Sequence, residues 1–135
     1  MKESIRKLIT TYENVRDSLL SELSMQREQG EPALARAVEP ASNSGILPLS
    51  GAKFELHGIG CRFEGKDGTV IEVDAGSGAT LGFNAWQLAC FAESSSRSPK
   101  DLGEIEAELR RAEESGELKK GTGAFAHLYF PRAKN

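Results

Sequence analysis

The stretch AKFELHGIGCRFEGKDGTVIEVDA, residues 52–75, decides the fold. Apolar and polar side chains alternate along most of it, which is typical of strands that bury one face. Near its middle, Lys66-Asp67-Gly68 suits a three-residue hairpin loop with a left-handed glycine in the last position. We therefore predict an antiparallel β-hairpin over these residues.

The register of this hairpin follows from the loop length that keeps one face apolar. A three-residue loop sets Phe63 opposite Ile71. It also sets Cys61 opposite Val73, whereas a two- or four-residue loop would place Glu72 among the apolar side chains. The other face would then carry two pairs, Arg62 opposite Glu72 and Gly60 opposite Asp74.

A change of apolar phase marks the first half of the hairpin. Upstream of Gly58 the apolar positions are Phe54 and Leu56, and downstream the apolar positions are shifted by one residue. Such a shift with two glycines at residues 58–60 predicts a bulge or bend. The second strand is expected to end at the Gly-Ser-Gly of residues 76–78.

Upstream of the hairpin, apolar residues at steps of three and four predict a helix over residues 2–29, with Gly30 as its C-terminal cap. The opposite face carries balanced charges, among them Arg16. The apolar residues form one stripe along the helix, which either packs in the core or pairs with the same helix of a second copy in a homodimer. Its members are Ile5, Leu8, Ile9, Tyr12, Val15, Leu19, Leu20 and Leu23.

Residues 30–51 are rich in glycine and proline and are predicted to form a long connecting loop. Within it, residues 33–38 are compatible with one or two helical turns. The uncharged residues 46–49 are expected to tuck against the core. A loop of this length in a compact domain is often functional or mobile.

Downstream of the hairpin, Asn84 is expected to cap a buried helix from Ala85 to about Glu93. Ser98-Pro99 is expected to start a second helix that ends at Ser115, before Gly116. The last strand is placed at residues 124–130. The buried face of the second helix would comprise Leu102, Ile105, Leu109 and Ala112.

Together these elements predict an α+β fold in a single domain, residues 1–135. It comprises a long N-terminal helix (1–29), a connecting loop (30–51) and a core (52–135). In the core, the antiparallel hairpin is followed by two helices and a final C-terminal strand. That strand is expected to join the hairpin in a sheet of at least three strands, with one face packed on the helices.

Composition sets several function classes aside. The 135 residues are 39% hydrophobic and 27% charged, which are globular values. A net charge of −3, with no basic run longer than two residues, predicts neither nucleic-acid nor membrane binding. The N-terminus lacks a signal-peptide apolar region, and no stretch approaches the ~20 apolar residues of a membrane span. With only two cysteines, the chain is expected to be cytoplasmic with reduced thiols.

Glu72 and Asp74 share one strand face, with Arg62 predicted opposite Glu72. Two carboxylates with an arginine suit acid–base work or a divalent cation. More often such a set is a solvated sheet face with one ion pair. Both interpretations stay open at this point.

Other catalytic and cofactor signatures are weak. His57 and Cys61 lack the spacing and the number of partners that a zinc site needs. A nucleophilic Cys61 or Cys90 would need a nearby histidine. The glycines at residues 58 and 60 lack the Lys-Ser/Thr of a phosphate loop, and no serine lies in a GxSxG elbow. We therefore assign no catalytic residue, metal or cofactor.

The helix predicted over residues 99–116 carries six acidic and three basic residues. It would suit a basic partner. A solvated face is the alternative.

Three motifs, HGIGC at residues 57–61, VIEVD at 70–74 and GFNAW at 82–86, resemble the core of a family of small bacterial proteins of unknown function. That core runs H-G-x-G-C, a hairpin, an acidic strand, and G-F-D-A-W opening a helix. The resemblance covers roughly residues 54–92, and Asn84 stands where the family more often has Asp. Small acidic proteins of this kind often accompany secreted toxins as immunity partners. The resemblance therefore implies a binding site at His57, Arg62, Glu72, Asp74 and Trp86.

The leading hypothesis is a non-catalytic protein-binding module of toxin-immunity type with a protein partner. The alternative is a small-ligand binder or an enzyme that uses the His57/Arg62/Glu72/Asp74 region. That alternative requires these side chains to converge in one pocket.

Overall fold

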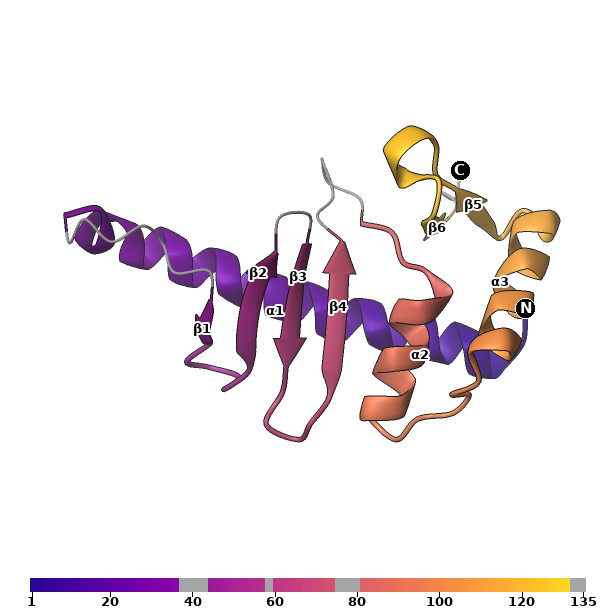
Figure 1. Ribbon diagram of the computed structural model, residues 1–135, viewed down its shortest axis with the longest axis horizontal. Helices are drawn as coiled ribbons and strands as arrows, with labels where there is room; N and C mark the ends of the chain where they lie inside the picture. Colours follow the sequence, from indigo (N-terminus) through magenta and orange to yellow (C-terminus); the bar gives the residue numbers. More distant parts are fainter. Residues whose placement is uncertain (37–43, 58–59, 75–80, 132–135) are drawn as a thin grey trace.

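The computed structural model describes residues 1–36, 44–57, 60–74 and 81–131, and within the first range the side chains of residues 1–25. These residues form three α-helices, one short 3-10 helix and two antiparallel sheets (Figure 1). The elements in chain order are α1 (Glu3–Arg36), β1 (Ser44–Ile46), β2 (Lys53–His57), β3 (Gly60–Glu64), β4 (Val70–Asp74), α2 (Ala85–Ser94), α3 (Leu102–Ser115), β5 (Leu118–Lys120), η1 (Gly123–Phe125) and β6 (Tyr129–Pro131).

The main sheet has four antiparallel strands in the order β1-β2-β3-β4. Helix α1 runs across one face of this sheet, and α2 and α3 follow beyond β4 (Figure 1). The α+β class predicted from the sequence is confirmed.

The predicted hairpin register is also confirmed. Phe63 pairs with Ile71 and Cys61 pairs with Val73. The amide of Gly65 donates to the carbonyl of Thr69 over 2.8 Å, which closes a three-residue loop. Gly68 has a φ of 90°, the left-handed conformation that this loop requires.

The segment expected as one bent strand is two strands. β2 and β3 pair antiparallel, with His57 opposite Gly60, so the chain reverses direction between these residues. The apolar positions shift by one residue because the chain reverses direction here. Each of the two strands begins its own alternation of apolar and polar side chains. Of the bulge or bend predicted at residues 58–60, Gly60 begins β3, and residues 58–59 lie outside the described residues, as does the strand end at 76–78. β1, in a region expected to be loop, adds the fourth strand.

Helix α1 extends past its predicted end. It continues through Gly30 to Arg36, so Gly30 is not a C-terminal cap. A glycine inside a helix costs only about 1 kcal/mol, and the helix-forming residues 33–36 favour continuation. The one or two turns foreseen after residue 30 are therefore part of the first helix.

The core lies between α1 and the sheet. The ring of Tyr12, which is fully buried, contacts Phe83 and Phe91 edge-on, with centroid distances of 6.5 and 5.7 Å. Arg16, expected on the polar face of the helix, is buried as well. Its guanidinium lies over the Tyr12 ring at 5.5 Å and donates to Asp17 over 2.8 Å, so both its stem and its charge are accommodated.

Residues 46–49 only partly tuck against the core. Leu47 is fully buried, but Ile46 and Leu49 are 60% and 82% exposed. Leu47 is held by its amide, which donates to the carbonyl of Ala52 over 2.8 Å. The tight turn that follows directs Leu49 outward.

Asn84 caps α2 as predicted. Its side chain accepts from the amide of Gln87 over 2.8 Å, and the Gln87 side chain accepts from the amide of Asn84 over 3.0 Å.

Helix α3 starts later than predicted. Asp101, not Ser98, caps it, because the Asp101 carboxylate accepts from the amides of Gly103 and Glu104. Its last turn ends at Gly116 as predicted. Leu102, expected to be buried, is 43% exposed because it lies in the first turn, before the helix reaches the core.

The C-terminal segment departs most from expectation. Residues 123–125 form the 3-10 helix η1, and β6 pairs with β5 in a separate two-stranded sheet. Helix α2 occupies the open edge of β4, where a further strand would add (Figure 1). The C-terminal segment is instead attached through Phe83 and Tyr129, whose backbones exchange hydrogen bonds of 3.0 and 2.7 Å.

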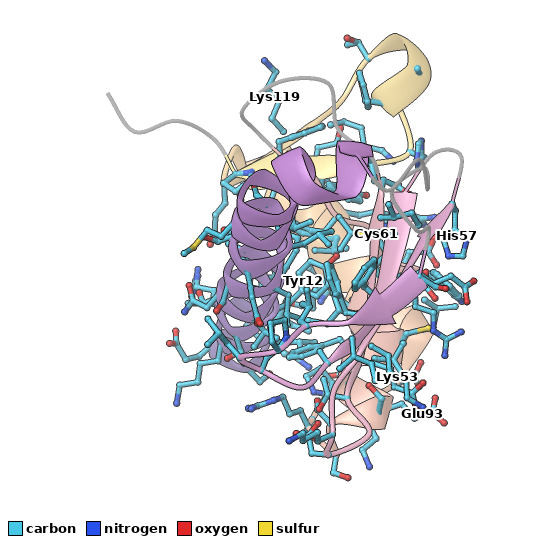
Figure 2. The ribbon with its side chains drawn as sticks, turned by 90° about the vertical axis from the view of Figure 1, so that its left-hand side faces the viewer. Tyr12, Lys53, His57, Cys61, Glu93 and Lys119 are labelled. Atoms are coloured by element: carbon cyan, nitrogen blue, oxygen red, sulfur yellow. The ribbon has the colours of Figure 1, made fainter. Side chains whose placement is uncertain are left out.

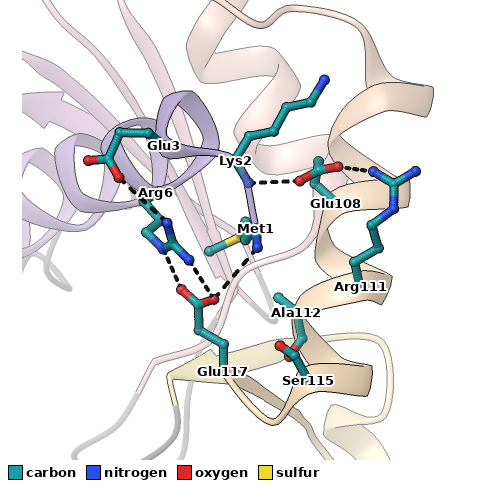
Figure 3. Close-up of polar contacts among 9 residues, drawn as sticks. All are labelled: Met1, Lys2, Glu3, Arg6, Glu108, Arg111, Ala112, Ser115 and Glu117. Carbon is teal, nitrogen blue, oxygen red and sulfur yellow. Dashed lines mark hydrogen bonds and ion pairs between the residues drawn. The ribbon is translucent and has the colours of Figure 1, made fainter.

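A polar clasp joins the start of α1 to α3 and to Glu117, two residues beyond the end of α3 (Figure 3). Arg6 donates to Glu117 through two nitrogens, over 2.7 and 3.1 Å. The backbone amide of Lys2 donates to the buried carboxylate of Glu108 over 2.8 Å, and Arg111 pairs with the same carboxylate. Contacts between residues more than 100 positions apart thus fix the first turn of α1.

Candidate functional site

The face of the main sheet turned away from α1, here called the outer face, carries the candidate site. Tyr12 and Cys61 lie between α1 and the sheet, whereas Lys53 and His57 lie on the other side (Figure 2). The separation follows from the alternation of side chains along each strand. The outer-face residues of the four strands are Ser44, Ile46, Lys53, Glu55, His57, Gly60, Arg62, Glu64, Val70, Glu72 and Asp74.

Arg62 and Glu72 are neighbours on this face, as the sequence predicted. They are directly opposite across β3 and β4, and the Arg62 Nε lies 3.6 Å from the Glu72 Oε1. The arginine side chain is 47% exposed, so water weakens the pair. Arg62 thus keeps a guanidinium surface open to solvent.

Asp74 has a partner that the sequence did not indicate. The Nε2 of His127, from the segment between η1 and β6, lies 3.0 Å from the Asp74 Oδ2. These residues are 53 positions apart, and they meet because the C-terminal segment folds back to the end of β4. No local spacing signal could have revealed this pair.

His57 lies in the same cross-strand row as Asp74, with Gly60 between them. Its Nδ1 is 3.7 Å from Glu55 on its own strand. The sequence could also have placed Lys53 and Glu55 on the outer face, because polar and apolar residues alternate along Lys-Phe-Glu-Leu-His of β2.

Trp86 is 53% exposed in the first turn of α2, although a well-buried helix was predicted. Leu88 and Phe91 fill the core side of this helix. Trp86, Cys90 and Glu93 follow one another at steps of four and three on the opposite side.

Cys90 connects this side of α2 to the outer face. Burial, then the charges of Glu72 and Glu93, raises the pKa of the Cys90 thiol, whereas Arg62 lowers it. Glu93, on the solvent side of α2, lies on the same side of the molecule as Lys53 and His57 (Figure 2).

The five predicted site residues lie on one side of the molecule, but they do not share a cavity. A shallow hollow of about 430 Å³ opens on the outer face. Of the five, only Arg62 lines it. The other lining residues are Ser44, Gly45, Ile46, Lys53, Phe54, Glu55 and Glu64.

Cys61 and His57 point to opposite faces of the sheet and form no joint site (Figure 2). Cys61 is buried, and burial, followed by the charge of Glu72, raises its thiol pKa to about 11. A protonated thiol is a poor nucleophile. Across the described ranges, no group of three His, Cys, Asp or Glu side chains is placed to hold a metal ion.

In the part of the chain that the structure describes, no helix combines the length and apolar composition of a membrane span.

Comparison with known proteins gives one match. A family model, described as a domain of unknown function (DUF6896), matches residues 5–131, which include the whole outer face and α2. No curated protein and no solved structure matches the chain.

Proposed function

The chain belongs to the DUF6896 family, a domain of unknown function, and we propose that it is a non-catalytic protein-binding module of the bacterial cytoplasm. Both cysteines are free, which suits a reducing compartment.

The exposed Trp86 is the observation that carries this proposal. More than half of its surface faces solvent, beside a face that also exposes Arg62. Tryptophan and arginine are the residue types that contribute most to protein interfaces. A large indole at the start of a helix offers a rigid apolar anchor next to charges that select the partner.

The charges indicate the class of partner. On the outer face and the solvent side of α2, five acidic side chains accompany two basic ones. Such a face complements a basic partner. The acidic residues are Glu55, Glu64, Glu72, Asp74 and Glu93, and the basic ones are Lys53 and Arg62.

The specific form of the proposal is immunity to a toxin. A toxin that cleaves nucleic acid needs a basic surface to bind phosphates. An acidic protein that covers this surface would block the substrate without any catalysis of its own. The partner is therefore a toxin domain with a basic substrate site.

The test begins with tagged protein in its native cells. We expect one stoichiometric partner in mass spectrometry of the purified complex, and loss of this partner with Trp86→Ala. The control is Leu49→Ala, which removes an even more exposed apolar side chain, at 82%, from the segment between β1 and β2, where the Leu49 amide donates to Glu22 of α1. The partner expressed alone should stop growth, and the wild-type chain, but not Trp86→Ala, should restore it.

Two results would count against the proposal. The first is a chain that retains no protein from its own cells. The second is a Trp86→Ala variant that binds the partner as tightly as wild type does, with both proteins purified. A bound partner without toxicity would retain the binding module and remove the immunity role.

A second candidate function is small-ligand binding, favoured by the hollow on the outer face. The sequence hypothesis required His57, Arg62, Glu72 and Asp74 to converge in one pocket. Because only Arg62 lines the hollow, this function ranks behind protein binding. Native mass spectrometry of the purified chain would reveal a retained small molecule, and Arg62→Ala should abolish its retention.

A further inference from the structure

Four side chains at the centre of the outer face form a square of alternating charge. Across the strands, Glu55 is opposite Arg62 and Lys53 is opposite Glu64. Along each strand the two members are two residues apart and also have opposite signs. Every charge in this square, which we call the charge square, therefore has neighbours of the opposite sign in both directions.

Part of the charge square is left without an internal partner. The Glu55 carboxylate lies 3.7 Å from the Nδ1 of His57, and Arg62 forms an ion pair with Glu72 at 3.6 Å. Among the residues that the structure describes, Lys53 and Glu64 form no ion pair. Their charges are therefore available to a partner molecule.

The rows that contain the charge square extend across all four strands. The first row reads Ile46, Lys53, Glu64, Val70, that is, apolar, positive, negative, apolar. The second row reads Ser44, Glu55, Arg62, Glu72.

A two-fold rotation makes this pattern complementary to itself. Consider an axis in the plane of contact, parallel to the strands and between β2 and β3. It places Lys53 over Glu64 of the second copy, and Glu55 over Arg62 of the second copy. In the first row it also places Ile46, which is 60% exposed, over Val70 of the second copy.

We propose that a second copy of this chain binds the outer face, forming a symmetric dimer through the charge square. Two-fold dimers are the commonest oligomers, and their contacts must be self-complementary in this way. The inference goes beyond the proposed function, since it needs no other protein. A partner anchored at Trp86 would compete with the second copy for this face.

The size of the face sets the strength of the dimer. Three strands of five residues and one of three cover at most about 19 Å by about 17 Å, or about 320 Å². A stable interface buries about 800 Å² per partner. We therefore expect a weak dimer that is sensitive to salt because its central contacts are charge pairs.

Sedimentation equilibrium of the purified chain tests the proposal. We expect self-association at about 50 mM salt, weakened about tenfold or more at about 500 mM. The variants Lys53→Glu and Glu64→Lys should each lose at least about tenfold in affinity, because each places like charges face to face. Circular dichroism spectra verify that both variants are folded.

Mixing the two variants is the decisive measurement. In a mixed dimer, Glu at position 53 meets Lys at position 64, and the native Glu64 meets the native Lys53, so association should return. The double variant Lys53→Glu/Glu64→Lys should also associate as wild type does. Matched reversals at Lys100 and Glu114, exposed residues outside the outer face, should change nothing, either alone or mixed.

Three results would overturn the proposal. One is a wild-type chain that stays monomeric at about 1 mM protein and low salt. Another is a dimer that the charge reversals do not weaken, which would point to the homodimer through the N-terminal helix. The third is a mixture of the two variants that stays monomeric. None of these results bears on binding to another protein.

Discussion

The hydroxyl of Tyr12 donates a hydrogen bond to the backbone carbonyl of Glu72 over 2.7 Å. Tyr12 is fully buried in α1, and burial raises the pKa of its hydroxyl, so the donor keeps its proton. Glu72 lies in β4 and directs its carboxylate to the outer face, where it pairs with Arg62. One hydrogen bond thus connects the core helix to the strand that positions the candidate site.

Replacing Tyr12 by Phe should therefore destabilise the fold by about 1–2 kcal/mol, because a buried carbonyl loses its donor. Urea unfolding at neutral pH measures the change in free energy. The matched control is Tyr129→Phe, since among the described residues the buried Tyr129 hydroxyl has no hydrogen-bond acceptor. Equal losses in both variants would show that the contact with Glu72 contributes nothing specific.

The Glu108 carboxylate should make stability depend on pH. The hydrogen bond from the Lys2 amide, together with the charge of Arg111, lowers the pKa of Glu108 below its usual value of 4.5. A lowered folded pKa means that the contribution is complete above about pH 4.5 and is lost as the pH falls through the folded value. Glu108→Gln should thus be less stable than wild type near pH 7, with a difference that shrinks toward about pH 3.

Urea titrations at both pH values test this prediction, with the exposed Glu106→Gln as the charge-matched control on α3. A Glu108→Gln deficit that stays constant with pH would assign the loss to packing rather than to the carboxylate charge.

The capping box of α2 should tolerate aspartate and reject alanine at position 84. Asn84→Ala loses the bond to the Gln87 amide and should cost about 0.5–2 kcal/mol. Asn84→Asp keeps the acceptor and adds a negative charge at the helix N-terminus, so it should be as stable as wild type or more stable. Thermal unfolding of both variants decides, and an Asn84→Asp variant as unstable as Asn84→Ala would refute the role of the cap.

Gly60 should be irreplaceable even by alanine. A Cβ at this position would lie 2.2 Å from the carbonyl oxygen of Val73, a backbone atom of the paired strand. Gly60→Ala should therefore destabilise the protein by about 2 kcal/mol or more. Gly68→Ala, where a Cβ meets nothing within 4 Å, should cost only about 1 kcal/mol for its φ of 90°. Comparable losses in the two variants would contradict the close approach of β3 and β4.

The sequence predicted the hairpin well because only one loop length keeps Glu72 out of the apolar face. The same alternation predicts Arg62 opposite Glu72, which is where the structure places it. Capping at Asn84 and termination at Gly116 were also predictable, since both depend on local backbone chemistry.

Features that depend on distant contacts could not be predicted. Arg16 is buried where its guanidinium donates to the carbonyl of Gly82, 66 residues away, whereas the periodicity of α1 alone assigned it to the polar face. Likewise, the partnership of His127 with Asp74 depends on how the C-terminal segment returns to the sheet. The exposure of Trp86 depends on which side of α2 meets the core, and a nearly all-apolar helix does not reveal this.

The polar clasp between Arg6 and Glu117 can be completed only late in synthesis on the ribosome. The first helix leaves the exit tunnel long before Glu117 is translated, 111 residues later. By then the strands of the main sheet, within residues 44–74, have already been translated, so α1 can pack on the sheet before Glu117 joins it. A nascent chain halted before this glutamate would therefore lack the Arg6 contact at the first turn of α1, while the rest of the helix is already able to pack on the sheet.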